Sequence, residues 1–347
     1  MKYTRVVLDA IGYELAPVVV TSDELEELIQ PVYEALRMPV GQLESLTGIS
    51  ERRWWEIGYP LSTGATAAAR KALEISSVGA SDLGVLVYTG VNRENFEPAT
   101  ACKVASELGL RGDVAVYDVS NACLGLLNAI VDIANRIELG QIRAGMAVSC
   151  ETAREINDVM IERMLEEPTM DLFTASLATL TGGSGAVAVV LCDESLGGKN
   201  AHRLVGGVNW AHPEFHGLCR WGLESQNGGA VRPIMSTDAV SVLKNGVVLG
   251  EETWRAFLDE IGWSTGDVDK VICHQVGSAN RDTILKTIGV PLAKDFSTYE
   301  FLGNMGTVSL PLTAALAEER DFLHSGDRVA FLGIGSGLNC LMMGFDW

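Results

Sequence analysis

The sequence predicts an α/β fold in which helices cover a buried sheet on both faces. Short, continuous apolar runs alternate with segments of helical periodicity, and such runs are typical of strands buried on both sides. The chain has 347 residues, of which 47% are hydrophobic and 20% are charged. This length and composition indicate a globular protein of roughly two domains of ~150 residues each.

The predicted strands occur in both halves of the chain. They cover residues 85–88, 114–117, 146–149, 186–191, 271–273, 329–332 and 341–345. An apolar segment from Leu124 to Leu139 has the length of a helix and follows the second of these strands. Because residues 194–199 contain two adjacent glycines, we expect one domain over residues 1–195 and a second over residues 196–347.

Two short motifs occur once in each half. Thr-Gly-Gly-Ser-Gly-Ala at residues 181–186 precedes an apolar strand, and Gly-Ile-Gly-Ser-Gly-Leu at residues 333–338 precedes another. Residues 116–123 are related in the same way to residues 297–305. Such internal similarity predicts a fold built from two related halves.

The charge balance excludes some classes of partner. The 45 acidic and 26 basic residues give a net charge of −19, which disfavours binding to nucleic acid or to an anionic membrane. No apolar run is long enough to span a membrane and no signal-peptide pattern is present, so we expect a cytoplasmic protein. The seven cysteines form no C-x-x-C pair, which predicts reduced thiols and no metal site.

Cys123 is the first candidate for a catalytic residue. It lies between a predicted strand and a predicted helix, where free backbone N–H groups and the helix dipole favour a thiolate. The same N–H groups could bind the oxyanion that forms when a thioester is attacked. The alternative is a small buried side chain that only packs against its neighbours.

His274 and Asn304 are further candidates. His274 follows the strand at residues 271–273, at the sheet edge where α/β proteins place their sites. Asn304 lies between Gly303 and Gly306, in a pattern typical of a tight turn. A histidine bonded to a backbone carbonyl and an ordinary turn asparagine are the alternatives.

A glycine-rich segment near the C-terminus resembles part of a dinucleotide-binding fingerprint. Gly335-Ser336-Gly337 lacks the third glycine of that fingerprint and precedes a strand instead of a helix. We therefore expect no nucleotide cofactor and interpret the segment as one that brings backbone N–H groups close to a thioester.

The order of these motifs resembles that of the thiolase-fold condensing enzymes. Asn121-Ala122-Cys123, His274-Gln275, Gly303-Asn304-x-Gly306 and Gly335-Ser336-Gly337 follow one another along essentially the whole chain. Within this superfamily the chain resembles the 3-oxoacyl-carrier-protein synthase III branch and, through residues 93–100, 118–124 and 151–153, the OleA group of olefin biosynthesis. The resemblance implies a duplicated, five-layered α-β-α-β-α fold and a homodimer.

The resemblance also implies a role for each candidate residue. Cys123 would be the nucleophile that carries the first acyl group. Nε2 of His274 and the amide of Asn304 would hold the enolate oxygen of the second thioester. The backbone N–H groups of Cys123 and Ser336 would form the oxyanion hole, and Glu97 would enter the active site of the neighbouring subunit.

Enzymes of the OleA group join two fatty acyl-CoA molecules head to head into a 2-alkyl-3-oxoalkanoic acid. No CO₂ leaves in that step, so a base must remove the α-proton. The resemblance gives this task to Glu97, with Glu94 on the same segment as the alternative. A partly buried carboxylate is a stronger base than one in water, and apolar Phe96 and Pro98 flank Glu97.

Two other functions remain open at this point. A decarboxylating 3-oxoacyl-carrier-protein synthase III would use acyl-CoA and malonyl carrier protein, and would bind that acidic partner through basic residues such as Arg52-Arg53 or Arg70-Lys71. A non-catalytic scaffold is disfavoured, because it needs no complete set of cysteine, histidine and asparagine. An acyl carrier protein and downstream pathway enzymes are candidate partners.

Two long acyl chains also require apolar channels that meet at Cys123. The segment from Met160 to Leu180 is rich in methionine and leucine and is our candidate lining, with an ordinary helix and dimer core as the alternative. One cysteine ester serving two acyl groups predicts ping-pong kinetics.

Overall fold

The computed structural model describes residues 1–225, 229, 231–274 and 276–347, so Gln275 of the predicted motif lies outside the described residues. Within these residues, nine strands join in one sheet in the order β11-β12-β13-β8-β1-β7-β6-β4-β5. Every strand that the sequence predicted is present in this sheet.

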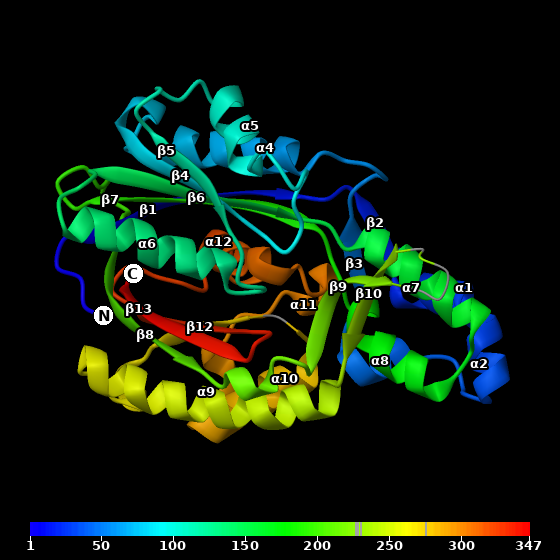
Figure 1. The fold of residues 1–347 in the computed structure, drawn as a ribbon. Helices are drawn as coiled ribbons and strands as arrows, with labels where there is room; N and C mark the ends of the chain where they lie inside the picture. The colour runs from blue at the N-terminus through cyan, green and yellow to red at the C-terminus, as the bar shows by residue number, and fades with distance from the viewer. Residues whose placement is uncertain (226–228, 230, 275) are drawn as a thin grey trace.

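The strands fall into two groups that lie in separate layers (Figure 1). One group consists of β1 (Val6–Leu15), β4 (Leu83–Thr89), β5 (Ala115–Val119), β6 (Ala144–Glu151) and β7 (Gly185–Asp193). The other consists of β8 (His202–Ala211), β11 (Lys270–Cys273), β12 (Arg328–Gly335) and β13 (Asn339–Asp346). Two residue pairs between β1 and β8, Val7 with Arg203 and Leu8 with His202, connect the groups.

Helices occupy the three remaining layers. α6 (Gly125–Glu138) and α12 (Ser309–Glu319) lie between the two strand groups (Figure 1). The outer helices are α4 (Leu61–Ile75) and α5 (Thr100–Glu107) on one side, and α9 (Ala239–Ile261) and α10 (Ser278–Ile288) on the other. This is the α-β-α-β-α arrangement that the sequence resemblance implied.

The two halves repeat one strand order. The sequence of neighbours β1-β7-β6-β4 corresponds to β8-β13-β12-β11. Of the two central helices, α6 packs on the first group, and α12 contacts β1 and β7 of the first group and β11 of the second. The repeated strand order confirms the predicted duplication. β7 ends at Asp193 and β8 begins at His202, on either side of the expected boundary. The division into two domains stays a prediction, because the strands form one continuous sheet.

α6 has the buried face that a central helix needs. Leu126, Ile130, Ile133 and Ile137 follow one another at intervals of three or four residues and are fully buried. α12 is buried over almost its whole length, in keeping with its position between two sheet layers.

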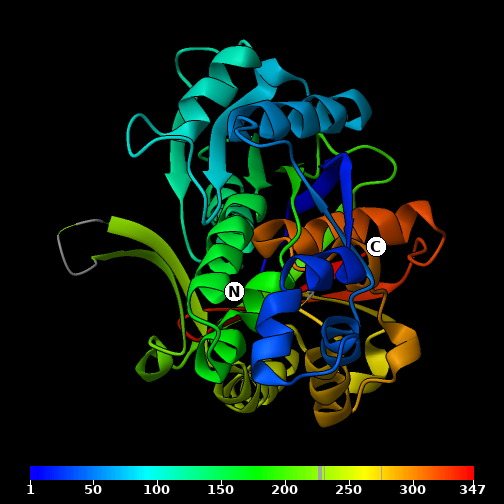
Figure 2. The same ribbon diagram turned by 90° about the vertical axis from the view of Figure 1, so that its right-hand side faces the viewer.

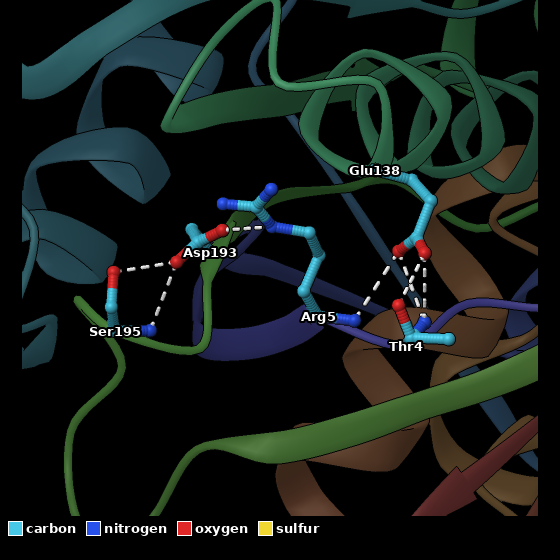
Figure 3. A network of polar contacts seen from close by, with 5 residues as sticks. All are labelled: Thr4, Arg5, Glu138, Asp193 and Ser195. Atoms are coloured by element: carbon cyan, nitrogen blue, oxygen red, sulfur yellow. Dashed lines mark hydrogen bonds and ion pairs between the residues drawn. The ribbon is translucent and has the colours of Figure 1, made fainter.

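The C-terminal end of α6 is fixed to the beginning of β1 by polar contacts (Figure 3). The carboxylate of Glu138 accepts hydrogen bonds from the N–H and the hydroxyl of Thr4 and from the N–H of Arg5. The Arg5 side chain pairs with Asp193, which also accepts hydrogen bonds from Ser195. These contacts orient the helix whose other end follows Cys123.

Smaller elements complete the molecule. The remaining elements lie outside the five layers: α1 (Ser22–Leu28), α2 (Gln30–Leu36), α3 (Gln42–Thr47), β2 (Val18–Thr21), β3 (Glu51–Trp54), α7 (Arg154–Glu166), α8 (Met170–Leu180) and α11 (Tyr299–Leu302). The hairpin of β9 (Cys219–Ser225) and β10 (Val231–Thr237) stands out from the body beside α7 and α8 (Figure 2). Among the described residues, no helix has the length and apolar character to cross a membrane.

Candidate active site

A cavity of about 630 Å³ opens where the carboxyl ends of several strands meet. Cys123, His274, Asn304 and Ser336, which lie far apart in the sequence, all line it. The structure therefore brings together four of the five residues that the sequence singled out. Glu97 lies elsewhere on the surface of this chain.

Cys123 lies in a sharp turn between β5 and α6. Ala122 adopts a left-handed backbone conformation with φ of 45°, which is rare for a residue with a side chain. The side chain of Asn121 bonds to Asn128 in α6 at 2.7 Å and to Asn339 in β13 at 3.2 Å. This network holds the turn against both halves of the protein.

The resting state of Cys123 is a thiol. Burial raises the pKa of Cys123 to about 12, and Cys219 and Glu151 add to the increase. The prediction that the helix end produces a thiolate is therefore wrong for this structure, because the loss of solvation outweighs the attraction of the helix dipole. A partner must accept the proton when the sulfur attacks.

The segment before Ser336 lies directly against the turn of Cys123. A Cβ placed on Gly335 would come within 3.4 Å of the backbone nitrogen of Cys123. The amide of Asn339 donates a hydrogen bond of 3.3 Å to the carbonyl of Ser336. Gly335 therefore permits the backbone segments of Cys123 and Ser336 to approach each other closely. These are the two segments whose N–H groups the resemblance assigns to the oxyanion hole.

His274 follows β11 and is neutral. Its backbone N–H bonds to the carbonyl of Leu332 at 2.9 Å. Burial lowers the pKa of His274 to about 4, so at neutral pH one ring nitrogen carries a hydrogen. Nδ1 is buried and has no hydrogen-bond partner within the described part of the chain.

Asn304 presents its amide nitrogen. Its backbone pairs with Thr181 and Gly183, with two hydrogen bonds of 2.9 Å. Oδ1 accepts a hydrogen bond of 3.0 Å from the N–H of Gly306, so the NH₂ group is the end that remains available as a donor. Gly303 has φ of +67°, and a Cβ there would lie 2.5 Å from the carbonyl oxygen of Thr181, so this turn requires glycine.

Glu97 lies on an exposed loop between β4 and α5. Phe96 beside it is 95% exposed. The expectation that Phe96 and Pro98 partly bury Glu97 is wrong within one chain, because all three residues are exposed. Such an exposed aromatic residue is typical of a surface that another protein covers.

Glu94, the alternative to Glu97, is held by its own chain. Its carboxylate accepts hydrogen bonds from the N–H of Ser62 at 3.0 Å and from the ammonium of Lys103 at 2.7 Å. Burial raises the pKa of Glu94, but the lowering effect of these partners is larger, so the pKa lies below its usual range. A weakly basic, occupied carboxylate is a poor acceptor for an α-proton.

The cavity also contains residues that sequence reasoning missed. Glu151 at the end of β6 and Cys219 at the beginning of β9 both line it. Glu151 entered the sequence argument only as part of a resemblance. A signal was available, since Glu151 lies two residues after the predicted strand at residues 146–149, at the sheet edge where α/β proteins place their sites.

The expected lining of the acyl channels needs correction. Ile161, Met164 and Phe173 are buried in a separate core with α1 and α2, so the alternative of an ordinary helix core holds for them. Ala178 and Thr179 of the same segment do line the cavity. The described part of the cavity wall takes apolar residues from α9, α10 and β12. It includes Val242, Leu243, Val247, Ile284 and Ile334.

The proposed basic patch at Arg52-Arg53 is also wrong. Arg52 is fully buried, and its guanidinium bonds to the hydroxyl of Ser22 at 3.1 Å. Lys71 forms an ion pair with Glu14. Neither arrangement leaves two adjacent free cations at the surface for an acidic partner.

Comparisons with known proteins agree with this geometry. Residues 258–347 match the family described as 3-Oxoacyl-[acyl-carrier-protein (ACP)] synthase III C terminal. The acyl-CoA:acyl-CoA alkyltransferase of Shewanella oneidensis is 56% identical, and that of Xanthomonas campestris is 34% identical. Both alignments cover 100% of each chain.

The solved structures show the same relationship. The cerulenin-bound OleA of Xanthomonas campestris superimposes with a TM-score of 0.94 at 34% identity, over 100% of this chain and 98% of that one. Structures of the same OleA include a complex with lauric acid and lauroyl-CoA, and forms in which one cysteine, one glutamate or one histidine is replaced. The chain belongs to the acyl-CoA:acyl-CoA alkyltransferase (OleA) family of thiolase-fold condensing enzymes.

Proposed function

We propose that this protein joins two fatty acyl-CoA molecules by a Claisen condensation that releases no CO₂. The observation that carries the proposal is the convergence of a thiol, a neutral imidazole and a free amide nitrogen on one largely apolar cavity. A thiol that carries an acyl group and two neutral donors for an enolate oxygen are the parts that the reaction needs.

In the first half-reaction, the sulfur of Cys123 attacks the carbonyl carbon of one acyl-CoA. The proton of the thiol passes to the departing sulfur, and free CoA leaves. The N–H groups of Cys123 and Ser336 bind the oxyanion that forms during attack. The close packing of Gly335 on Cys123 supports this pairing.

In the second half-reaction, a base removes the α-proton of another acyl-CoA. His274 and Asn304 donate hydrogen bonds to the enolate oxygen, and the enolate carbon attacks the acyl group on Cys123. The Cys123 sulfur leaves and regains a proton from the protonated base. Hydrolysis of the remaining CoA thioester by water then yields a 2-alkyl-3-oxoalkanoic acid and a second CoA.

Glu97 is the base in this proposal, and it acts in the cavity of a partner copy. The cysteine and glutamate replaced in the structures of Xanthomonas OleA are 26 positions apart. Cys123 and Glu97 have the same separation of 26, whereas Glu94 does not. The exposure of Glu97 and Phe96 in a single chain supports a homodimer in which this loop crosses to the other subunit.

The cellular setting and partners form part of the same proposal. The seven cysteines are all free thiols, which supports a reducing compartment such as the cytoplasm. The protein needs no bound cofactor, since acyl-CoA supplies both carbon chains. Downstream enzymes that use the 3-oxo acid are candidate partners.

The alternative is a decarboxylating 3-oxoacyl-carrier-protein synthase III, which the match of residues 258–347 favours. That reaction requires an acidic carrier protein to bind. The burial of Arg52 removes the leading candidate for a basic contact surface. The full-length relatives named alkyltransferase support the non-decarboxylating reaction instead.

The deciding experiment supplies one long-chain acyl-CoA and no malonyl carrier protein. We expect mass spectrometry to find a 3-oxo acid, or the ketone formed by its loss of CO₂, that contains both acyl chains. Cys123→Ser should form no acyl-enzyme. Strict dependence on malonyl carrier protein, or a labelled acyl group on another cysteine, would contradict the proposal.

A further inference from the structure

Glu151 is a buried carboxylate that the reaction above does not use. It is 3% exposed and lines the same cavity as Cys123. Its carboxylate oxygens accept hydrogen bonds from the N–H of Val91 at 2.9 Å, the N–H of Asn92 at 3.3 Å and the side-chain amide of Asn92 at 3.1 Å. The N–H of Thr307 also donates to it. All of these partners are donors and lower the pKa of Glu151, but burial outweighs them and raises that pKa to about 7.

Two of the three residues that donate these hydrogen bonds, Val91 and Asn92, lie at the beginning of the loop that carries Glu97. Val91 and Asn92 follow β4 directly, and the loop continues to Glu97 before α5 begins. The Asn92 amide nitrogen also donates to the carbonyl of Thr152 at 2.8 Å, so both of its hydrogens have acceptors at the end of β6. Glu151 therefore fixes the starting point of this loop.

The remaining donor connects Glu151 to the rest of the site. Thr307 is three residues after Asn304, and its hydroxyl accepts a 2.7 Å hydrogen bond from the N–H of Leu126 in the first turn of α6. Gly306 packs on the carboxylate so closely that a Cβ there would lie 3.3 Å from Oε1. One carboxylate thus contacts the loop of Glu97 and the turn of Asn304, and through Thr307 it reaches the helix after Cys123.

We propose that Glu151 is a positioning residue for the condensation step, which sets the Glu97 loop relative to the Asn304 turn. The inference rests on the proposed function in that Glu97 serves as the base. We assign removal of the α-proton to Glu97 and not to Glu151, because hydrogen bonds from Val91, Asn92 and Thr307 already engage the Glu151 carboxylate, which has about four lone-pair sites. Its action is to hold Glu97 where the partner's enolate forms.

The test compares Glu151→Gln with the wild-type protein in three measurements. Glutamine presents an NH₂ group to donors, so it cannot hold the loop in the same way. We expect hydrogen exchange in peptides spanning residues 90–99 to be about 10-fold faster or more. Condensation should fall by about 10-fold or more, while acylation of Cys123, followed by intact-protein mass, should not slow by more than about 3-fold, because Glu151 is one of the groups that raise the pKa of Cys123.

Glu26→Gln is the matched control. Glu26 is also a buried carboxylate, 5% exposed, and it accepts hydrogen bonds from the backbone N–H groups of Gly41 and Leu43, but it does not line the cavity. Its replacement should accelerate exchange near residues 41–43 and leave the ratio of condensation to acylation unchanged.

A second variant keeps the proposal testable if Glu151→Gln folds poorly. Asn92→Ala removes one donor and leaves the carboxylate in place, so it should slow condensation in the same selective way. The double variant should be no slower than Glu151→Gln alone, because both act through one loop. Equal losses in both half-reactions, or unchanged exchange over residues 90–99, would overturn the inference.

The exchange measurement needs no substrate, so it tests Glu151 separately from the reaction. A wild-type protein that forms no two-chain product would contradict the proposed function. Faster loop exchange in Glu151→Gln would still support the structural role of this carboxylate.

Discussion

Cys123, the proposed nucleophile, is an unusually weak acid. Its turn places the sulfur in the cavity, yet burial raises the pKa of Cys123 to about 12. The thiol is therefore protected from unspecific oxidation and alkylation until a substrate enters, since the thiolate is the reactive form.

This acidity predicts a distinctive pH dependence of alkylation. The rate at which iodoacetamide modifies Cys123 should rise by about 10-fold per pH unit from pH 7 to pH 10 without a plateau, because the thiolate fraction keeps increasing. Peptide mass spectrometry would follow the modification, with exposed Cys102 as the internal reference. A plateau near pH 8.5 would show that the thiol behaves as it does in water.

Glu97 and Glu94 give a second prediction at this scale. Glu97→Gln should leave acylation of Cys123 by acyl-CoA intact but stop carbon–carbon bond formation, because no base remains for the α-proton. Glu94→Gln is the control, since the Glu94 carboxylate is bonded to Ser62 and Lys103 of its own chain. The readouts are acyl-enzyme mass and two-chain product; normal condensation by Glu97→Gln would remove the base assignment.

Among the elements, α6 connects structure and chemistry most directly. Its apolar face packs between the two strand groups, its first turn follows Cys123, and Glu138 in its last turn is bonded to Thr4 and Arg5 (Figure 3). Burial raises the pKa of Glu138, but the lowering effect of the Thr4 and Arg5 hydrogen bonds is larger, so the pKa lies below its usual range.

A prediction about stability follows for this element. A carboxyl group whose pKa is lower in the folded state stabilises the fold above its unfolded pKa, and this contribution is lost as pH falls. Glu138→Gln should therefore lower the free energy of unfolding by about 1 kcal/mol or less at pH 7, because the site is partly solvated. Urea unfolding would measure the difference, which should shrink below about pH 4.

The control for this prediction is Glu74→Gln on the exposed side of α4. It should have no measurable effect on urea unfolding at either pH. A pH-independent loss in Glu138→Gln would indicate that packing, instead of the charged hydrogen bonds, holds the end of α6.

At the scale of the whole molecule, one chain holds all of the proposed catalytic side chains in its cavity except Glu97. The cavity contains the thiol, the imidazole and the amide, but the proposed base lies on an exposed loop of the same chain. β5 is an edge strand of the sheet with every residue only half-buried. The loop that carries exposed Phe96 follows β4, the strand next to this edge. An unpaired edge strand and an exposed aromatic residue close to it in the fold support an assembly of two copies.

Mixed dimers test this arrangement. Cys123→Ser and Glu97→Gln should each be inactive in condensation as pure proteins. Unfolding and refolding them together should restore about a quarter of the wild-type rate, because half of the dimers are mixed and each of these has one complete site. Product formation by mass spectrometry would measure the recovery. No recovery, despite mixed dimers seen by native mass spectrometry, would contradict the exchange of Glu97.

The sequence by itself determined the buried parts of the fold. Strands β4 and β7 are continuously apolar because both of their faces are buried, and the central helix α6 has apolar residues at helical intervals. Such patterns can be recognised in the sequence alone. The sequence did not predict β1, β8 or the β9–β10 hairpin. β1 carries Asp9 and Gly12 within its run, and β9 is mostly exposed, so neither has the expected composition.

The candidate site divides in the same way. Motif order identified Cys123, His274, Asn304 and Ser336, because each is adjacent to a recognisable strand or turn. Only the tertiary structure decided the protonation of Cys123, the burial of Arg52 and the hydrogen bonds of Glu151. The solvation and the hydrogen bonds of a side chain depend on neighbours that are distant in the chain, and local sequence patterns do not identify those neighbours.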